Sequence, residues 1–350
     1  MENSRLEKNS VTIMNAVYIN KSDKNIEPAD EHKCDSTNSD NSPSEESIVP
    51  LPCPPLKPED TDCCGSGCVP CVFDIYEQDL KIWRKECRKI KEKQRNEENL
   101  SDDHLLSDSE YRKFCITEIR QETNNCFRYR LKLSEFSSLG LKVGQHIIVR
   151  DTNNGSAVSR QYTPITDVCC LGHFDLLIKI YDHGKMSQCV RQWSVGTGIE
   201  VRGPFGNLQY SPNKYRKLLL LAAGTGIAPM SQVIQCILGN EEDDTLIQLY
   251  YACKSYEEIL MKSELNEWSS FWNFSVTYIL SQETGNGRSY RYGDKVCEGR
   301  MDLAFLTKNV SPSDINSGTF ILVCGTKYFD NDMIEHCKHL SFKDIQIHRF

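Results

Sequence analysis

The stretch Lys217-Leu218-Leu219-Leu220-Leu221-Ala222 decides the fold of the second half of this chain. A continuous apolar run of this kind is typical of a strand that is buried on both faces of a parallel sheet. The run leads into Gly224-Thr225-Gly226-Ile227-Ala228-Pro229 and then into a helical pattern from Met230 to Leu238. Glycines let the backbone approach a ligand closely, and proline is favoured at the first position of a helix. We therefore expect a strand, a nucleotide-binding turn and a helix. Pro229 replaces the third glycine of the dinucleotide fingerprint, so an ordinary strand-to-helix turn is the alternative.

The sequence after this stretch alternates between strand and helix patterns. Strands are expected at residues 246–252, 274–280, 320–324 and 345–350, and a helix is expected at 330–340. The spacing of Ser255-Tyr256-Glu257-Glu258 is that of a capping box and predicts a helix that continues to about Trp268. Such alternation favours a parallel sheet with helices on both faces, so residues 213–350 are expected to form a Rossmann-like α/β domain. Cys324-Gly325 falls on the carboxyl edge of that sheet, where such sheets bind ligands.

The preceding part of the chain, residues 111–212, is expected to form a small antiparallel Greek-key β-barrel. Phe127, Tyr129, Leu131 and Leu133 alternate as in a half-buried strand. Further strands are expected at residues 144–149, 174–181 and 199–202, and a turn at 151–155. Several short strands with few helices between them favour a barrel.

The stretch Arg160-Gln161-Tyr162-Thr163-Pro164-Ile165-Thr166 carries the chemistry of this barrel. Side chains alternate along a strand, so Arg160 and Tyr162 share a face, and a cation beside a ring suits an anionic aromatic ligand. A plain Arg–Tyr pair on a half-exposed strand is the alternative. Gly184-Lys185-Met186-Ser187 offers free backbone N–H groups and a hydroxyl, which suit a pyrophosphate. Together the two stretches supply the ring site and the phosphate site that a dinucleotide needs.

The first hundred residues differ from the rest in composition. Residues 1–60 are polar and end in a proline cluster, which predicts a disordered tail. Residues 61–96 are expected to form a Cys-rich turn and a helix, followed by an acidic linker at 97–110. The turn contains four cysteines, which form a candidate metal or iron–sulfur cradle, whereas the alternative is a compact turn packed on the helix. These are Cys63, Cys64, Cys68 and Cys71.

The helix expected from Asp74 to about Arg95 is amphipathic and basic. Its apolar stripe consists of Tyr76, Leu80, Trp83, Cys87 and Ile90. A basic amphipathic helix can lie on a membrane or dock on a partner. We expect instead that the stripe packs against its own protein.

Composition excludes several classes of protein. The 350 residues carry a formal net charge of −8 and the sequence pI is about 5.6, which argues against a general nucleic-acid binder. The polar stretch Met1–Ser10 shows no apolar signal core, so an oxidising compartment is not implied. Most of the 17 cysteines are therefore expected to be reduced thiols. No apolar run approaches the roughly 18 residues that cross a bilayer. We expect a cytoplasmic, monomeric enzyme, with peripheral contact at the endoplasmic reticulum or mitochondrial membrane as an option.

Taken together, these motifs resemble the ferredoxin-reductase-like flavoproteins, and most closely the NADH–cytochrome b5 reductase family. The motifs occur in the family order as Arg160–Pro164, Gly184–Ser187, Gly203–Gly206, Gly224–Pro229 and Cys324-Gly325. The resemblance covers about Tyr111 to Phe350 and implies an FAD-binding barrel followed by an NADH-binding domain. Residues 61–96 resemble the short oxidoreductase-like module that precedes several eukaryotic proteins.

The resemblance also implies roles for individual residues. Arg160 is expected to contact the FAD pyrophosphate, Tyr162 to pack on the isoalloxazine, and Thr163 to hydrogen-bond near N5, with Pro164 in the same segment. His146 matches a histidine in a proton-linked network with that threonine, although its residue context alone suggests a structural role. Gly184, Lys185, Met186 and Ser187 are expected to hold the FAD phosphates.

The NADH half is assigned in the same way. Lys179 matches a lysine associated with NADH binding, and Cys324 matches the cysteine beside the nicotinamide. The nicotinamide half of NADH is expected to rest on Gly224, Thr225, Gly226, Pro229 and Gly325. Glu258 is expected to bind ribose hydroxyls and to repel a 2′-phosphate, which favours NADH over NADPH.

The implied reaction is hydride transfer from NADH to FAD, followed by one-electron delivery to a haem protein such as cytochrome b5. One alternative keeps both cofactors but reduces a quinone, a ferric chelate or another small acceptor. Another is a catalytically silent flavin- or nucleotide-binding interaction protein. The chain departs from the family where three prolines are replaced by Thr326-Lys327-Tyr328, so the loop near the nicotinamide is expected to differ.

Overall fold

The computed structural model describes residues 51–63, 70–93, 105–283, 290–316 and 318–350. The first sheet is antiparallel, in the strand order β4-β3-β6-β1-β2-β5. A further bridge between Pro164 and Leu176 joins the continuation of β4 to β5 and closes the sheet into a barrel. The strands are β1 (Arg112–Thr123), β2 (Cys126–Lys132), β3 (His146–Asn153), β4 (Ser156–Tyr162), β5 (His173–Lys179) and β6 (Gly198–Phe205), and α2 (Lys185–Val190) follows β5. The predicted antiparallel barrel is confirmed.

The β3–β4 hairpin is tighter than predicted. The turn was expected over residues 151–155, but β3 continues to Asn153 and only Asn154 and Gly155 form the loop. Both have positive φ, 48° and 74°, as a two-residue hairpin turn requires. Arg160 and Tyr162 therefore lie at the carboxyl end of β4, away from the hairpin turn.

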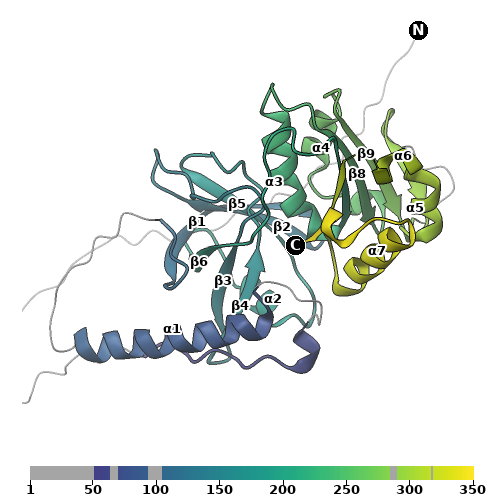
Figure 1. Ribbon diagram of the computed structural model, residues 1–350. Helices are drawn as coiled ribbons and strands as arrows, with labels where there is room; N and C mark the ends of the chain where they lie inside the picture. The colour runs from purple at the N-terminus through teal and green to yellow at the C-terminus, as the bar shows by residue number, and fades with distance from the viewer. Residues whose placement is uncertain (1–50, 64–69, 94–104, 284–289, 317) are drawn as a thin grey trace, which may run out of the picture. The chain divides into compact units, whose positions relative to one another are not determined.

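The second sheet is parallel, in the order β10-β9-β8-β7-β11-β12. Figure 1 shows β8 and β9 of this sheet with helices around them. Its strands are β7 (Lys217–Ala223), β8 (Leu246–Cys253), β9 (Phe274–Leu280), β10 (Lys295–Glu298), β11 (Thr319–Cys324) and β12 (Ile347–Arg349). Its helices are α3 (Ile227–Leu238), α4 (Lys262–Trp268), α5 (Leu303–Asn309), α6 (Pro312–Asn316) and α7 (Lys327–His339). Leu218 and Leu220 of β7 pack in the core with α3 and α4, whereas Leu219 and Leu221 pack in the core with α5 and α7. The apolar run of β7 is therefore covered on both faces, as predicted.

The helix predicted from Ser255 to Trp268 is broken in the structure. Tyr256–Glu258 form a single 3-10 turn, η3, and the Ser255 side chain makes no capping hydrogen bond. Met261 then has a left-handed φ of 54°, so α4 begins only at Lys262. The capping-box prediction was wrong because the buried residues Ile259 and Leu260 take the chain into the core before the helix starts.

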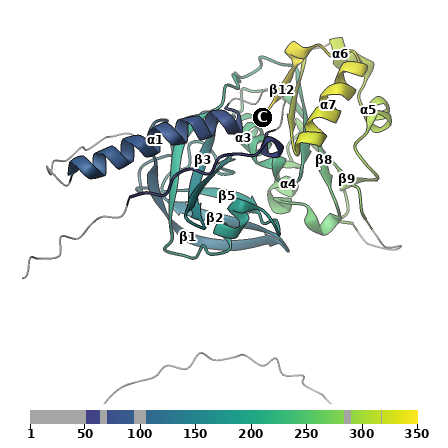
Figure 2. The ribbon, with the colours of Figure 1, turned by 90° about the horizontal axis from the view of Figure 1, so that it is seen from below.

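The amino-terminal part of the described chain packs on the barrel. The η1 turn (Asp60–Asp62) is followed by α1 (Val72–Lys93), which runs along the barrel in both views (Figures 1 and 2). Residues 54–57 lie within the stretch predicted as a tail, yet Leu56 N–H donates to the Ala157 carbonyl at 2.7 Å and Ala157 N–H donates to the Pro54 carbonyl at 2.8 Å. These bonds use the open edge of β4, and the Trp83 indole of α1 donates to the Pro52 carbonyl at 2.7 Å. Residues 1–50 lie outside the described residues.

The face that α1 buries is one residue away from the predicted stripe. The residues at its centre are Ile75, Asp79 and Ile82, at 3–7% exposure, while those of the predicted stripe are only half-buried. Asp79 meets Arg202 of β6, whose side chain is fully buried, with Oδ1 to Nη2 at 3.0 Å. The expectation that α1 packs against its own protein is confirmed, but a buried ion pair rather than a continuous apolar stripe sets its orientation.

Candidate flavin and nicotinamide site

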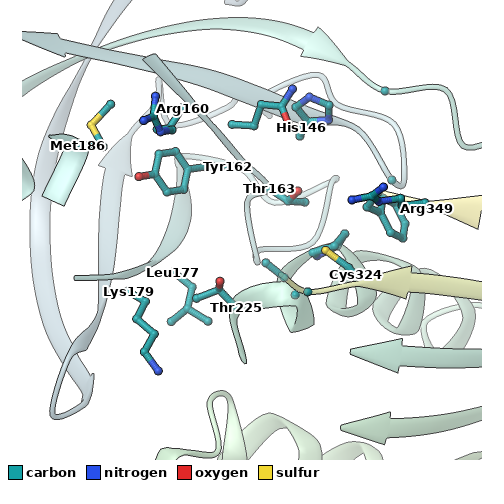
Figure 3. A pocket seen from close by; sticks show the side chains of 18 of the residues that line it. His146, Arg160, Tyr162, Thr163, Leu177, Lys179, Met186, Thr225, Cys324 and Arg349 are labelled. Carbon is teal, nitrogen blue, oxygen red and sulfur yellow. The ribbon is translucent and has the colours of Figure 1, made fainter. Parts of the chain in front are cut away.

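A cleft of about 550 Å³ lies where the barrel meets the carboxyl edge of the parallel sheet. The predicted site residues that line it are His146, Arg160, Tyr162, Thr163, Lys179, Gly184, Lys185, Met186, Ser187, Thr225, Gly226, Pro229, Cys324 and Gly325. Figure 3 shows Arg160, Tyr162 and Met186 grouped at one end, with Thr163 between them and Cys324. The structure thus brings together residues that are more than 170 positions apart in the sequence. Three predicted residues, Pro164, Gly224 and Glu258, are not part of the lining.

The segment that carries Arg160 is fixed from both domains. The Arg160 guanidinium donates to the Ser159 carbonyl at 2.8 Å. Beyond the end of β4, the Pro164 carbonyl accepts a hydrogen bond from Gln232 Nε2 of α3 at 3.0 Å. Burial raises the pKa of Tyr162, so its phenol is neutral and its ring packs as an apolar surface. Pro164 therefore acts on the site by anchoring Thr163 rather than by lining the cleft.

The turn before α2 is shaped by Ser187. Its buried hydroxyl accepts a hydrogen bond from the Tyr181 backbone N–H at 3.0 Å. A Cβ at Gly184 would lie 2.7 Å from Ser187 Oγ, so a side chain at this position would displace the Ser187 hydroxyl. Glycine here thus leaves the hydroxyl free to accept the bond from Tyr181.

Lys185 and Arg160, two cations of the cleft, have acidic neighbours in η1 and directly before it. Lys185 Nζ lies 3.4 Å from Glu59 Oε1 and 3.9 Å from Asp62 Oδ2. Asp62 Oδ1 also lies 3.9 Å from Arg160 Nη2. An anionic ligand at Arg160 and Lys185 would share them with two carboxylates, so the amino-terminal module contributes to the charge of the site.

His146 is the first residue of β3 in the barrel, and it lines the cleft. Its Nε2 is buried and has no hydrogen-bond partner among the described residues. Burial lowers the pKa of His146 from 6.5 to about 4, so the ring is neutral at physiological pH. A neutral ring with an unused nitrogen suits a hydrogen bond to a ligand in the cleft.

Acidification is expected to destabilise the fold through His146. Because its pKa is about 4 in the folded chain and 6.5 as a free side chain, the unfolded chain takes up the proton first as the pH falls from 7 to 4. The loss of unfolding free energy is expected to reach about 3 kcal/mol at most. Urea unfolding of wild type and His146→Gln between pH 7 and 5 measures it, and the variant should show the smaller decline. An equal decline in both chains would contradict this account.

The side of the cleft that is predicted to hold the nicotinamide is formed by two touching loops. Gly224–Gly226 form the 3-10 turn η2 after β7, and Cys324-Gly325 follow β11. A Cβ at Gly226 would lie 2.0 Å from the Cys324 carbonyl oxygen. The pKa of Cys324 is raised by burial and by Asp330, so its sulfur is a neutral thiol rather than a thiolate. The chain leads from β7 to β8 on one side and from β11 to β12 on the other side of this parallel pair. This contact therefore marks the switch point at which open α/β sheets bind ligands.

Gly226→Ala is expected to damage this side of the cleft selectively. The added methyl group must push the Cys324 backbone away, which moves the surface predicted to hold the nicotinamide. We expect the reduction of bound flavin by NADH to slow about 100-fold or more, because misplacement by about 1 Å has costs of that order, while flavin content is unchanged. Stopped-flow absorbance measures the rate. Gly198→Ala, where a Cβ would meet only Lys113 Cδ at 3.9 Å and the backbone has no positive φ, is the control for a glycine change elsewhere.

Lys179 and Glu258 form an ion pair between the two domains. Lys179 Nζ, at the end of β5, lies 3.1 Å from Glu258 Oε2 in η3. Of these two residues, Lys179 lines the cleft and Glu258 does not. The carboxylate predicted to meet ribose hydroxyls is thus held by the lysine predicted to meet NADH, so any dinucleotide contact involves the two together.

The cleft has lining residues that were not predicted. They are Gly144, Gln161, Leu177, Tyr181, Gly206, Asn207, Ala228, His348, Arg349 and Phe350. His348, Arg349 and Phe350 come from β12 and its end, beside β11, and Arg349 Nε lies 3.1 Å from Asp330 Oδ2. The pairing of Ile347–Arg349 with β11 carries them there, and the short sequence pattern of β12 gave no signal of it.

The cysteine cradle falls partly outside the described residues. Cys64 and Cys68 lie outside them, so a metal site built from all four cysteines stays a prediction. Cys63 and Cys71 are described, and their sulfur atoms are 3.7 Å apart. Within the described ranges, no group of three or more His, Cys, Asp or Glu side chains is placed to hold a metal ion.

The chain matches three family models. An oxidoreductase FAD-binding domain matches residues 113–210, an oxidoreductase NAD-binding domain matches 220–337, and the N-terminal part of oxidoreductase-like proteins matches 48–92. The fold and the shared cleft therefore define a two-domain, FAD- and NAD-dependent oxidoreductase with an oxidoreductase-like module before it. The residues of the cleft fit FAD, because its barrel side offers the Tyr162 ring and the cations Arg160 and Lys185. It also offers the His146 nitrogen, which has no partner among the described residues.

Individual relatives narrow the class. The human NADH-cytochrome b5 reductase-like protein is 39% identical over 281 residues, which span 80% of this chain and 89% of that protein. NADH-cytochrome b5 reductase 1 of Dictyostelium discoideum is 38% identical over 70% of this chain and 83% of its own. The crystal structure of the cytochrome b5 reductase domain of Ulva prolifera nitrate reductase superposes with a TM-score of 0.63 at 27% identity, covering 70% of this chain and 99% of that one. The chain belongs to the NADH–cytochrome b5 reductase family.

Proposed function

We propose that this NADH-dependent flavin oxidoreductase passes single electrons to a haem protein of the cytochrome b5 type. The observation that carries the proposal is the single cleft that joins the barrel segment Arg160–Thr163 to the nicotinamide-side loops at Gly226 and Cys324. The names of the relatives support the acceptor, since they are reductases of cytochrome b5. Bound FAD supplies the chemistry that converts a two-electron hydride into single electrons.

The side chains have separate tasks in this proposal. Arg160 and Lys185 bind the phosphates of FAD, and Tyr162 packs against its ring. Thr163 and the neutral His146 hydrogen-bond at the ring edge, where the Nε2 of His146 has no other partner among the described residues. Gly226 and Cys324 shape the surface that aligns the nicotinamide, and alignment at contact distance accelerates transfer.

The preference for NADH is proposed to depend on Glu258. Its carboxylate is half-buried and paired with Lys179, so it remains at a fixed place where a 2′-phosphate would be repelled. Glu258→Gln is expected to raise kcat/KM for NADPH several-fold while changing that for NADH less. Glu257→Gln, one residue earlier on an exposed side chain, is the control. Equal changes with both dinucleotides would contradict the proposal.

The acceptor is tested by stopped-flow mixing of the FAD-loaded chain with NADH and then with cytochrome b5 or ferricyanide. We expect both acceptors to be reduced. Reduction of ferricyanide but not of cytochrome b5 would contradict the haem-protein acceptor and favour a quinone, ferric or other small acceptor. A chain that shows no visible flavin absorbance after FAD is added would overturn the enzymatic proposal itself and favour an interaction protein.

We also propose that the enzyme acts as a cytoplasmic monomer with peripheral contact at a membrane. Within the described parts of the chain, none of the helices has the length and apolar character that crossing a bilayer requires. The outward face of α1 keeps Lys81, Arg84, Lys85 and Arg88 exposed, which supports weak attraction to anionic lipids. Sedimentation with vesicles containing phosphatidylserine, compared with neutral vesicles, tests this contact, and equal recovery in both pellets would contradict it.

A further inference from the structure

The described chain contacts the rim of the cleft on both sides of residues 64–69, which are the two ends of the segment that joins η1 to α1. At one end, the Asp62 carboxylate lies 3.9 Å from Arg160 and 3.9 Å from Lys185. At the other end, the Pro70 carbonyl accepts a hydrogen bond from Gln161 Nε2 at 2.9 Å. Arg160, Gln161 and Lys185 all line the cleft. Both ends of the segment are therefore in direct contact with the predicted FAD site.

Cys63 and Cys71 are the residues next to these two anchors, and their sulfur atoms are 3.7 Å apart. The backbone of each cysteine is fixed. The Cys63 carbonyl accepts a hydrogen bond from Lys327 Nζ at 3.1 Å, and the Cys71 N–H donates to Asp74 Oδ2 at 2.9 Å. A disulfide needs the sulfurs at about 2.05 Å, so the pair has to close by less than about 2 Å, which small side-chain rotations supply.

The pair also lies where the two domains meet. Lys327 belongs to α7 of the NAD-binding domain, whereas Gln161 belongs to β4 of the barrel. Lys327 stands where the family has one of its three prolines, and its ammonium group reaches the Cys63 carbonyl. The cysteines are thus held against the cleft from both sides, by residues that the flavin chemistry itself does not require.

We propose that Cys63 and Cys71 form a second redox centre, a dithiol–disulfide couple at the rim of the flavin cleft. This inference rests on the proposed function, because the reducing electrons come from NADH. In oxidation, one cysteine thiolate attacks a small disulfide such as glutathione disulfide and releases one glutathione; the second cysteine then displaces the other. In reduction, the hydride of NADH supplies two electrons and one proton equivalent, and solvent supplies the second proton. The disulfide becomes two thiols and NADH becomes NAD⁺.

An anaerobic titration of the FAD-loaded full chain with NADH tests this couple. The chain is first oxidised with glutathione disulfide, which is then removed by gel filtration. We expect the wild type to consume about two equivalents of NADH per chain, about one for the flavin and about one for the disulfide. Alkylation before and after the titration, followed by mass spectrometry of the peptides, should map the disulfide to Cys63 and Cys71 and show its disappearance.

Two variants complete the test. Cys63→Ser should consume about one equivalent, and Cys115→Ser, which removes an exposed cysteine of the barrel, should still consume both. A wild-type chain that takes up a single equivalent would overturn the inference, as would a disulfide that maps to other cysteines. If NADH fails to bleach the flavin absorbance, that result would count against the proposed function instead. The peptide map after oxidation still identifies which cysteines are paired, because it does not depend on NADH.

Discussion

Replacing Arg160 by alanine is expected to weaken FAD binding about 10- to 100-fold, since a charge-assisted hydrogen bond to phosphate contributes roughly 1.5–3 kcal/mol. Arg160 lines the cleft together with Tyr162, and 37% of its side chain is exposed. The Asp62 carboxylate lies near both Arg160 and Lys185. It therefore competes with a bound phosphate for the Arg160 guanidinium. Titration of the flavin-free chain with FAD, followed by flavin fluorescence, measures the dissociation constant.

The matched control for this change is Arg84→Ala. Arg84 is an exposed arginine of α1, so its removal changes the net charge equally but leaves the cleft intact. Arg160→Ala with the affinity of wild type would show that the assignment of Arg160 to the pyrophosphate is wrong.

Replacing Asp79 by leucine is expected to destabilise the fold by about 3–5 kcal/mol, because it removes the carboxylate that pairs with the buried guanidinium of Arg202. Asp79 also accepts hydrogen bonds from the Tyr111 hydroxyl at 2.7 Å and the Ser159 hydroxyl at 2.5 Å. Burial, with the negative charge of Asp79, raises the pKa of Tyr111, so its hydroxyl keeps its proton and remains a donor. Urea unfolding monitored by circular dichroism measures the loss.

A second substitution separates the lost charge pair from lost packing. When Arg202→Met is combined with Asp79→Leu, no unpaired charge remains, and the double variant should be more stable than Asp79→Leu alone. Glu77→Gln, on the exposed face of the same helix, should change stability by less than about 0.5 kcal/mol. If Asp79→Leu unfolds at the urea concentration of wild type, the pair does not anchor α1.

Much of the fold could be predicted because burial leaves a periodic pattern in the sequence. The leucines of β7 show it as a continuous run, and the residues of β2 show it as alternation. The orientation of α1 could not be read in this way, since Asp79 lies on the buried face and hydrophobic periodicity assigns an acidic residue to the surface. Its partner Arg202 is 123 residues away, and only the tertiary fold brings them together.

Those parts of the candidate site that have a local sequence signature could likewise be predicted, whereas those that depend on the tertiary fold could not. Segments with a glycine turn beside a polar residue, such as Gly184–Ser187 and Gly224–Gly226, have a local signature. His348 and its neighbours have none, because they reach the cleft through pairing of β12 with β11. Glu258 was expected early in a helix that follows a strand and instead lies in the 3-10 turn η3. Its ion pair with Lys179 depends on how the two domains meet.

The glutamines of α3 limit how this enzyme can move. The Gly144 N–H donates to Gln232 Oε1 at 2.9 Å in a buried position, and Gln235 Nε2 donates to the Ile165 carbonyl at 2.9 Å. Hinge opening between barrel and sheet would break these hydrogen bonds and replace them with bonds to water, at a net cost of about 0.5–1.5 kcal/mol for each. The Gly144 amide is therefore expected to be protected from exchange with deuterium, since it exchanges only when this contact opens. Any entry of NADH or exit of NAD⁺ that required the two domains to swing apart would first have to break these bonds.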